Sequence, residues 1–130
     1  MNNFRNLLIW KTAIKNVKEV YKLTSIIKKQ GDWSLADQIN RAAVSIPSNI
    51  SEGSSRRSKK DFARFIEIAI GSSYELESQL VIVHAVYSFD TSELLTAVKE
   101  NQKMLQGFKK CLIWKVPNCQ GNLGLYTEYF

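Results

Sequence analysis

Few side chains in this 130-residue sequence have the types and spacing that metal binding needs. His84 is the only histidine, and no other histidine or cysteine lies at a helical ligand spacing from it, so a zinc-type site is not expected. Cys111 and Cys119 are too few and too far apart for a zinc knuckle or a redox pair. Two reduced thiols are typical of a cytoplasmic protein. We therefore predict no metal site and no cofactor.

The carboxylates and possible nucleophiles do not form a catalytic pattern either. Glu75 and Glu77 are two residues apart, which points them to different faces of a helix. The chain has no evident Ser-His-Asp or Cys-His arrangement, no Glu-x-x-His pair and no glycine-rich phosphate loop. Glu52 is interpreted as a structural carboxylate rather than a perturbed catalytic one. Its candidate partners are Arg41, Arg56 and Arg57. The sequence thus predicts no catalytic residue and no enzyme activity.

Basic side chains are the group with a functional pattern. Lysine and arginine number 18 against 12 acidic residues, a net charge of +6. Residues 1–31 hold seven basic residues and one acidic residue, so the charge excess of the whole chain lies in its first quarter. Such a balance favours acidic partners such as nucleic acid. The candidate phosphate contacts are Lys11, Lys15, Lys18 and Lys22, at helical spacing, and Arg56, Arg57, Lys59 and Lys60, in a polar turn.

The kind of contact that these residues would make follows from their surroundings. Each neutralised phosphate adds affinity that depends on salt and not on base sequence. Aromatic residues do not interleave with these lysines, so stacking of single-stranded bases is not expected. Contacts to the nucleic-acid backbone or to structured RNA are the more natural hypothesis. The alternative is a solvated helix face that only keeps the protein soluble.

Helical spacing dominates the segments that must position these residues. Apolar residues at three- and four-residue steps predict helices over about 4–29, 34–53, 58–88 and 91–114. Ser34 and Ser58 are the expected caps of the second and third helices. Pro47 lies inside the second pattern, where its missing amide predicts a kink. The apolar stripe expected on the first helix consists of Trp10, Ala13, Ile14, Val17, Val20, Tyr21 and Thr24.

Short turns join these helices, and short turns favour antiparallel neighbours. The predicted fold class is all-α: an antiparallel up-down-up-down four-helix bundle with a kinked second helix and an irregular C-terminal tail. The bundle is assigned to residues 1–114 and the tail to 115–130. The tail is rich in apolar side chains and is expected to dock on the bundle or on a neighbouring subunit. No apolar run approaches the roughly 20 residues of a membrane span, and no signal peptide is evident, so a cytoplasmic protein without a membrane partner is expected.

The run QINRAAVSIPSNISEGS at 38–54 is distinctive. Together with the opening LLIWKTAIKNVKEVYKLT and the later FARFIEIAIGSSYELESQL, it strongly resembles the four-helix-bundle family that includes the proteins encoded in 23S rRNA intervening sequences. The accessory proteins of diversity-generating retroelements look like distant relatives. The likeness covers Leu7 to about Leu112. Beyond Trp114 no family pattern is recognisable.

The resemblance implies a bundle that assembles into a ring, typically a homopentamer, with a surface that binds nucleic acid in some relatives. It supplies no established activity. Asn40 stands where the family usually has a second arginine, which lowers the local charge. The motif positions interpreted as structural or as subunit contacts are Arg41, Ser45, Pro47, Asn49, Glu52 and Gly53.

Together these features favour one function and leave a second open. The leading hypothesis is a non-enzymatic, basic homo-oligomer that binds RNA or DNA backbone and is linked to 23S rRNA intervening sequences. The alternative is a homo-oligomeric assembly or scaffold protein that does not bind nucleic acid.

Overall fold

The computed structural model describes residues 3–114. A short 3-10 helix, η1 (Phe4–Asn6), precedes four long helices: α1 (Leu8–Lys29), α2 (Trp33–Ser54), α3 (Lys59–Tyr87) and α4 (Ser92–Ile113). The first helix therefore starts four residues later than the apolar spacing predicts, because η1 and an extended residue, Leu7, come first. The predicted tail at 115–130, with its predicted docking, lies outside the described residues.

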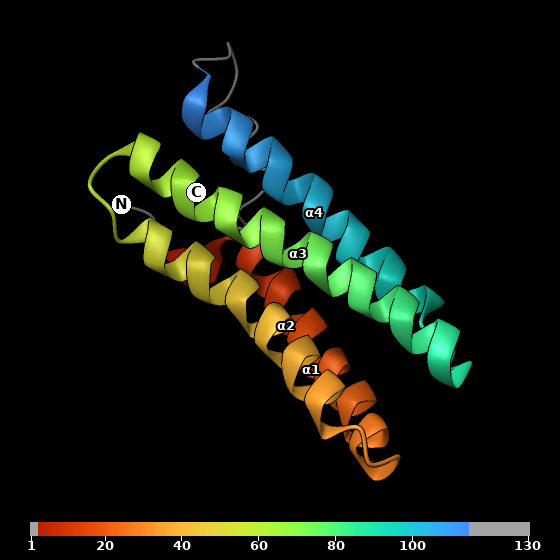
Figure 1. Ribbon diagram of the computed structural model, residues 1–130. Coiled ribbons are helices and arrows are strands. Elements are labelled where there is room, and N and C mark those ends of the chain that lie inside the picture. The colour runs from red at the N-terminus through yellow and green to blue at the C-terminus, as the bar shows by residue number, and fades with distance from the viewer. Residues whose placement is uncertain (1–2, 115–130) are drawn as a thin grey trace.

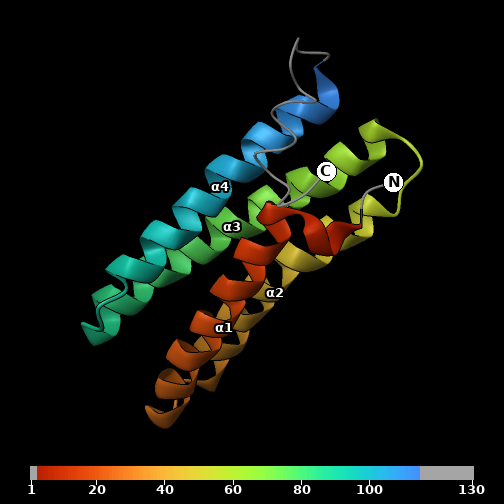
Figure 2. The ribbon, with the colours of Figure 1, turned by 180° about the vertical axis from the view of Figure 1, so that it is seen from behind.

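Consecutive helices run antiparallel, in up-down-up-down order (Figure 1). α1 packs against α2 and α4, and α3 also packs against α2 and α4, so the helices form a ring with four seams. The view from behind shows α1 with α2 on one side and α4 on the other (Figure 2). The predicted all-α four-helix bundle is confirmed.

Aliphatic side chains from all four long helices form one core. The apolar stripe predicted for the first helix is buried or half-buried except at two positions. Ile14 and Tyr21 are 41% and 50% exposed. Each directly follows a buried residue, Ala13 or Val20, and so lies about 100° round the helix from it. The buried residues of α1 are Ile9, Ala13, Asn16, Val20, Thr24 and Ile27.

A glycine sets the turn between α1 and α2. Gly31 has φ +87°, a left-handed conformation that glycine adopts without a steric penalty. Its amide donates to the carbonyl of Lys28 at 2.9 Å, and the amide of Asp32 donates to the carbonyl of Ile27 at 3.4 Å. This pair of bonds is a Schellman motif, and it satisfies carbonyls at the end of α1 that would otherwise lack a partner.

Two polar side chains start the next helices. Asp32 caps α2, with Oδ1 accepting from the amide of Leu35 at 3.2 Å. The predicted cap, Ser34, lies inside the helix instead, because the helix begins at Trp33. Ser58 caps α3 as predicted and accepts from the amide of Asp61 at 3.1 Å.

Pro47 lies inside α2, as predicted, and the helix is assigned without a break from Trp33 to Ser54. Proline has no amide to donate to the carbonyl of Ala43, so one hydrogen bond of the helix ladder is missing there. The ring of Pro47 is buried in the bundle.

Among the described helices, none is long and apolar enough to cross a membrane.

Each seam of the ring also holds a hydrogen bond between side chains or from a side chain to the backbone. The bonded pairs are Thr24 with Asn40 (2.8 Å, α1–α2), Ser45 with Ser72 (2.8 Å, α2–α3), Gln102 with the carbonyl of Ser73 (3.2 Å, α3–α4) and Asn101 with the carbonyl of Ile9 (3.1 Å, α1–α4). Sliding one helix along another would leave these groups unpaired in a seam of low polarity. The pairs therefore help to set which turn of each helix faces its neighbour.

Candidate nucleic-acid interface

The lysine stripe predicted on the first helix lies on the outward side of α1. Lys15, Lys18 and Lys22 are exposed, and Lys11 is half-buried. At 100° per residue, their spacing keeps all four within about 60° of one another. Nζ of Lys22 lies 3.1 Å from Oε1 of Glu19, in an exposed ion pair. The structure thus brings these four predicted residues together on one helix face.

One flank of this stripe is acidic. A groove of about 610 Å³ runs between α1 and α4, with Lys15 and Lys22 on its α1 side. Its α4 side carries the acidic residues Asp90, Glu93 and Glu100. Hydrogen bonds from the hydroxyl and the amide of Ser92 hold the pKa of Asp90 below its usual value, so this carboxylate is ionised at neutral pH. Like charges repel, and a polyanion on the stripe is therefore favoured toward α2 rather than toward α4.

The second predicted basic group lies at the α2–α3 turn, at the end of the bundle where α1 begins (Figures 1 and 2). Arg56 is already engaged: Nη2 lies 3.3 Å from Oε1 of Glu52, and Cζ lies 4.7 Å from the ring centre of Phe65. The other members are exposed; they are Arg57, Lys59 and Lys60. The stripe follows α1 while this group sits on a turn between two other helices.

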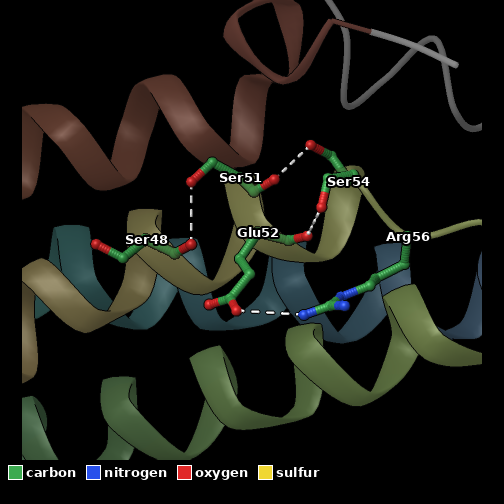
Figure 3. Close-up of polar contacts among 6 residues, drawn as sticks. Ser48, Ser51, Glu52, Ser54 and Arg56 are labelled. Atoms are coloured by element: carbon green, nitrogen blue, oxygen red, sulfur yellow. Dashed lines mark hydrogen bonds and ion pairs between the residues drawn. The ribbon is translucent and has the colours of Figure 1, made fainter.

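At the serine-rich end of α2, serine hydroxyls donate hydrogen bonds to backbone carbonyls of the same helix (Figure 3). The hydroxyl of Ser51 donates to the carbonyl of Ser48 at 3.0 Å, and that of Ser54 donates to the carbonyl of Ser51 at 2.6 Å. Glu52 points away from these bonds toward Arg56 (Figure 3). The interpretation of Glu52 as a structural carboxylate agrees with this geometry, with Arg56 as its partner among the three candidates.

Residues in the middle of α2 that belong to the 38–54 motif lie at the seam between α2 and α3. The hydroxyls of Ser45 and Ser72 lie 2.8 Å apart, and Nδ2 of Asn49 donates to the carbonyl of Ser45 at 2.7 Å. Ser45 and Asn49 are both half-buried. Arg41 is exposed and lies outside this network. Ser45 thus links α2 to α3, Asn49 bonds to Ser45 within α2, and Arg41 remains accessible to a ligand.

Gly53 lies where α2 packs tightly against α3. A Cβ atom at this position would lie 2.7 Å from Cβ of Phe65 and 2.8 Å from Cδ1 of Phe62. Both distances are shorter than any ordinary carbon–carbon contact. The glycine is therefore needed for packing within one chain, as a structural reading of the motif predicts.

The α1–α2 seam has a feature that the sequence analysis misses. Trp33 and Tyr21 are exposed beside basic residues, and Nζ of Lys28 lies 5.1 Å from the ring centre of Trp33. Tyr21 lies on the side of α1 that faces α2, where it lines a hollow with Lys28, a lysine outside the predicted stripe. The apolar spacing of α1 placed Tyr21 in the core stripe, so its exposure was not predicted. The usable signal was two aromatic residues close in sequence to Lys22 and Lys28.

The remaining candidates for chemistry show ordinary environments. His84 is exposed, and its Nδ1 lies 2.9 Å from the carbonyl oxygen of Phe89. Cys111 is half-buried on α4, and Cys119 lies outside the described residues. Within residues 3–114, no group of three or more histidine, cysteine, aspartate or glutamate side chains is placed to hold a metal ion.

Comparisons with known proteins agree with this architecture. A family model described as 23S rRNA-intervening sequence protein matches residues 5–107. A solved structure from Bacteroides thetaiotaomicron, described as a protein with unknown function from the S23 ribosomal protein family, is similar with a TM-score of 0.67 and 18% sequence identity. The similarity covers 82% of this chain and 99% of that one, and at this identity it shows a shared fold. Among curated proteins, no significant match is found.

Proposed function

Since the chain belongs to the 23S rRNA-intervening sequence protein family, we propose that it is a non-enzymatic, basic protein that binds the phosphate backbone of RNA or DNA through the outward face of α1. The proposal includes self-association into a homo-oligomer. It assigns no catalytic activity, cofactor or metal to the chain. It also assigns the protein to the cytoplasm, where a basic protein encounters RNA.

The placement of the excess charge carries this proposal. The net charge of residues 1–31 equals the +6 of the whole chain. Four of the seven basic residues in that segment share one face of α1. Each phosphate that such a face neutralises releases a counterion, so affinity accumulates along the helix and falls with added salt. The acidic α4 flank supports a single approach direction, from the side of α2.

A matched pair of charge variants tests this face. The triple change Lys15→Gln, Lys18→Gln and Lys22→Gln is compared with Lys99→Gln, Lys103→Gln and Lys110→Gln, exposed positions on α4. Both variants lose the same charge. Fluorescence anisotropy with a dye-labelled oligonucleotide at low salt should show an affinity loss of about tenfold or more for the α1 variant and a much smaller one for the α4 variant. Equal losses would show that only net charge matters and would reject the face.

Self-association is supported by a separate observation. Ile68, Ile82 and Val86 are exposed on α3, at spacings that keep them on one side of the helix. Exposed apolar groups of this kind mark protein–protein contacts. We propose that a homo-oligomer covers them, a pentamer being the state that the family resemblance implies. Light scattering should give a mass several times that of the chain, reduced by Ile82→Glu; a monomer at micromolar concentration would contradict this.

The same apolar residues favour the second candidate function, an assembly protein without a nucleic-acid ligand. They are independent of the lysines, and an oligomer built on them needs no polyanion. An oligomer that ignores both RNA and DNA at low salt would favour the assembly role over the binding role.

A further inference from the structure

Two adjoining hollows lie along the α1–α2 seam, near the Gly31 turn. Their volumes are about 410 and 540 Å³, and both are lined by Tyr21, Lys28 and Asn40. Trp33 also lines the first of them, and Arg41 lines the second. The hollows lie on the flank of α1 that faces α2, which is the side away from the acidic groove. None of the four stripe lysines lines either hollow, so an extended ligand on the stripe reaches them by passing round α1 toward α2.

Aromatic rings form part of this surface. The side chain of Trp33 is 60% exposed and that of Tyr21 is 50% exposed, although both residue types gain free energy from burial. Lys28 holds its ammonium group 5.1 Å from the ring centre of Trp33, a cation–π contact that fixes the indole at the surface. The exposure of Trp33 leaves much of the ring open to a flat ligand. Such a platform suits stacking with a nucleobase.

Asn40 supplies a directed polar group. The residue is only 8% exposed, and its Oδ1 accepts a 2.8 Å hydrogen bond from the hydroxyl of Thr24. Because Oδ1 is held by Thr24, Nδ2 is the group left for a ligand, and it has no hydrogen-bond partner within residues 3–114. Asn40 lines both hollows, so this donor is available to an acceptor in either one. Nucleobases carry such acceptors on their edges.

Charges around the hollows suit a phosphate chain. Lys28, Lys29 and Arg41 line them, and the single acidic lining residue, Asp37, is paired with Lys28 at 3.5 Å. Nearby, Lys22 continues the stripe along α1. Phosphates of a bound strand can therefore contact cations on both sides of a base that enters the hollows.

We propose that these hollows bind an unpaired nucleobase of a single-stranded segment, which rests on the proposed function of the α1 face. The base stacks on Trp33 and Tyr21, and an acceptor on its edge takes a hydrogen bond from Nδ2 of Asn40. The neighbouring phosphates contact Lys29 and Arg41. A base inside a duplex is already stacked and cannot enter, so the site discriminates single strands from double strands.

The test compares two exposed tryptophans. Trp33→Ala is matched by Trp114→Ala, because Trp114 is 63% exposed and lies beyond the end of α4. Affinities are measured for a dye-labelled single-stranded RNA of about 12 nucleotides and for a duplex of the same length. Trp33→Ala should weaken single-strand binding by roughly 5- to 100-fold and leave duplex binding within about twofold. Trp114→Ala should change neither.

Two further variants test the geometry. Asn40→Asp keeps an acceptor for Thr24 but removes the donor and adds a negative charge, so it should weaken single-strand binding more than duplex binding. Trp33→Phe keeps an aromatic platform and should bind nearly as wild type, while the quenching of tryptophan fluorescence by RNA disappears. If Trp33→Phe is quenched as strongly as wild type, with Trp10 and Trp114 as its remaining tryptophans, the base does not stack on Trp33 and the assignment is overturned.

The outcomes separate this site from the function on which it rests. Wild-type protein that binds neither probe rejects the proposed function itself. Binding that is reduced equally by Trp33→Ala and Trp114→Ala overturns the base site and leaves the lysine face standing. A drop in the mass measured by light scattering for Trp33→Ala would show that Trp33 is a contact between subunits, which also overturns the base site.

Discussion

The phenol hydroxyl of Tyr87 donates a 2.7 Å hydrogen bond to Oδ2 of Asp32, 55 residues earlier in the chain. This bond joins the last residue of α3 to the turn that starts α2. It raises the pKa of Tyr87 above 10.0, because a phenolate would lose the donated proton and face a carboxylate. Partial burial of the ring acts in the same direction.

This link makes stability sensitive to alkaline pH. The pKa of Tyr87 is higher in the folded chain than in the unfolded one, so its contribution is complete below 10.0 and is lost as the pH rises through the folded value. Tyr87→Phe should lower the melting temperature at neutral pH, and the difference from wild type should shrink above about pH 10. Thermal melts followed by circular dichroism would show it. Tyr74→Phe, at an exposed tyrosine bonded to Gln106, is the control.

Two glycines predict alanine effects of opposite sign. Gly53→Ala would force a Cβ within 2.8 Å of Phe65 and Phe62 and should destabilise the bundle by about 1–3 kcal/mol, less a helix-propensity gain of at most ~1 kcal/mol. Gly71→Ala, where no atom lies within 4 Å of the new Cβ, should stabilise it by about 0.5–1 kcal/mol. Urea unfolding measures both. Effects of the same sign would argue against tight packing at Gly53.

The seam between α1 and α4 contains a buried amide that makes two hydrogen bonds. Nδ2 of Asn101 donates to the carbonyl of Ile9 at 3.1 Å and to Oγ1 of Thr12 at 2.7 Å. Asn101→Ala should cost about 1–3 kcal/mol, because two hydrogen bonds from α4 to α1 are lost. Oδ1 of Asn101 has no partner within the described chain, which keeps the expected loss toward the lower value. Gln106→Ala, an exposed change on the same helix, should stay within about 0.5 kcal/mol of wild type in the same urea assay.

Adjacent arginines at the α2–α3 turn should contribute unequally to nucleic-acid binding. Both arginines are exposed, but Arg56 pairs with Glu52 and lies over Phe65. Arg57→Gln should reduce the slope of log affinity against log salt by about 1, and Arg56→Gln should reduce it less. Salt titrations of the two variants decide the matter. Equal reductions of the slope in the two variants would mean that the ion pair between Arg56 and Glu52 opens when nucleic acid binds.

Regular spacing made most of the fold predictable. Positions such as Ile39, Leu80 and Leu105 recur at helical steps, and glycine or serine punctuates the turns, so the order and direction of the helices follow from local chemistry. Capping was less predictable. Asp32 and Ser34 are both good capping residues, and the choice depends on the Schellman turn at Gly31, whose geometry the sequence does not display.

The candidate site was predictable only in part. The outward position of Lys15, Lys18 and Lys22 follows from spacing alone. The aromatic flank does not, because Tyr21 lies at the edge of the apolar stripe, where only the packing of α2 decides whether it is covered. The role of Asn40 likewise needs the neighbouring helix, since its partner Thr24 comes from α1.

The ring of helices closes between α1 and α4, and no turn links those two. The chain is therefore two helical hairpins connected by residues 55–58 alone. If that connection straightened, the second hairpin of one molecule would complete the first hairpin of another, with the same seams now formed between chains. Such a domain-swapped dimer would preserve the core, and its formation would depend on protein concentration and on the length of that single link.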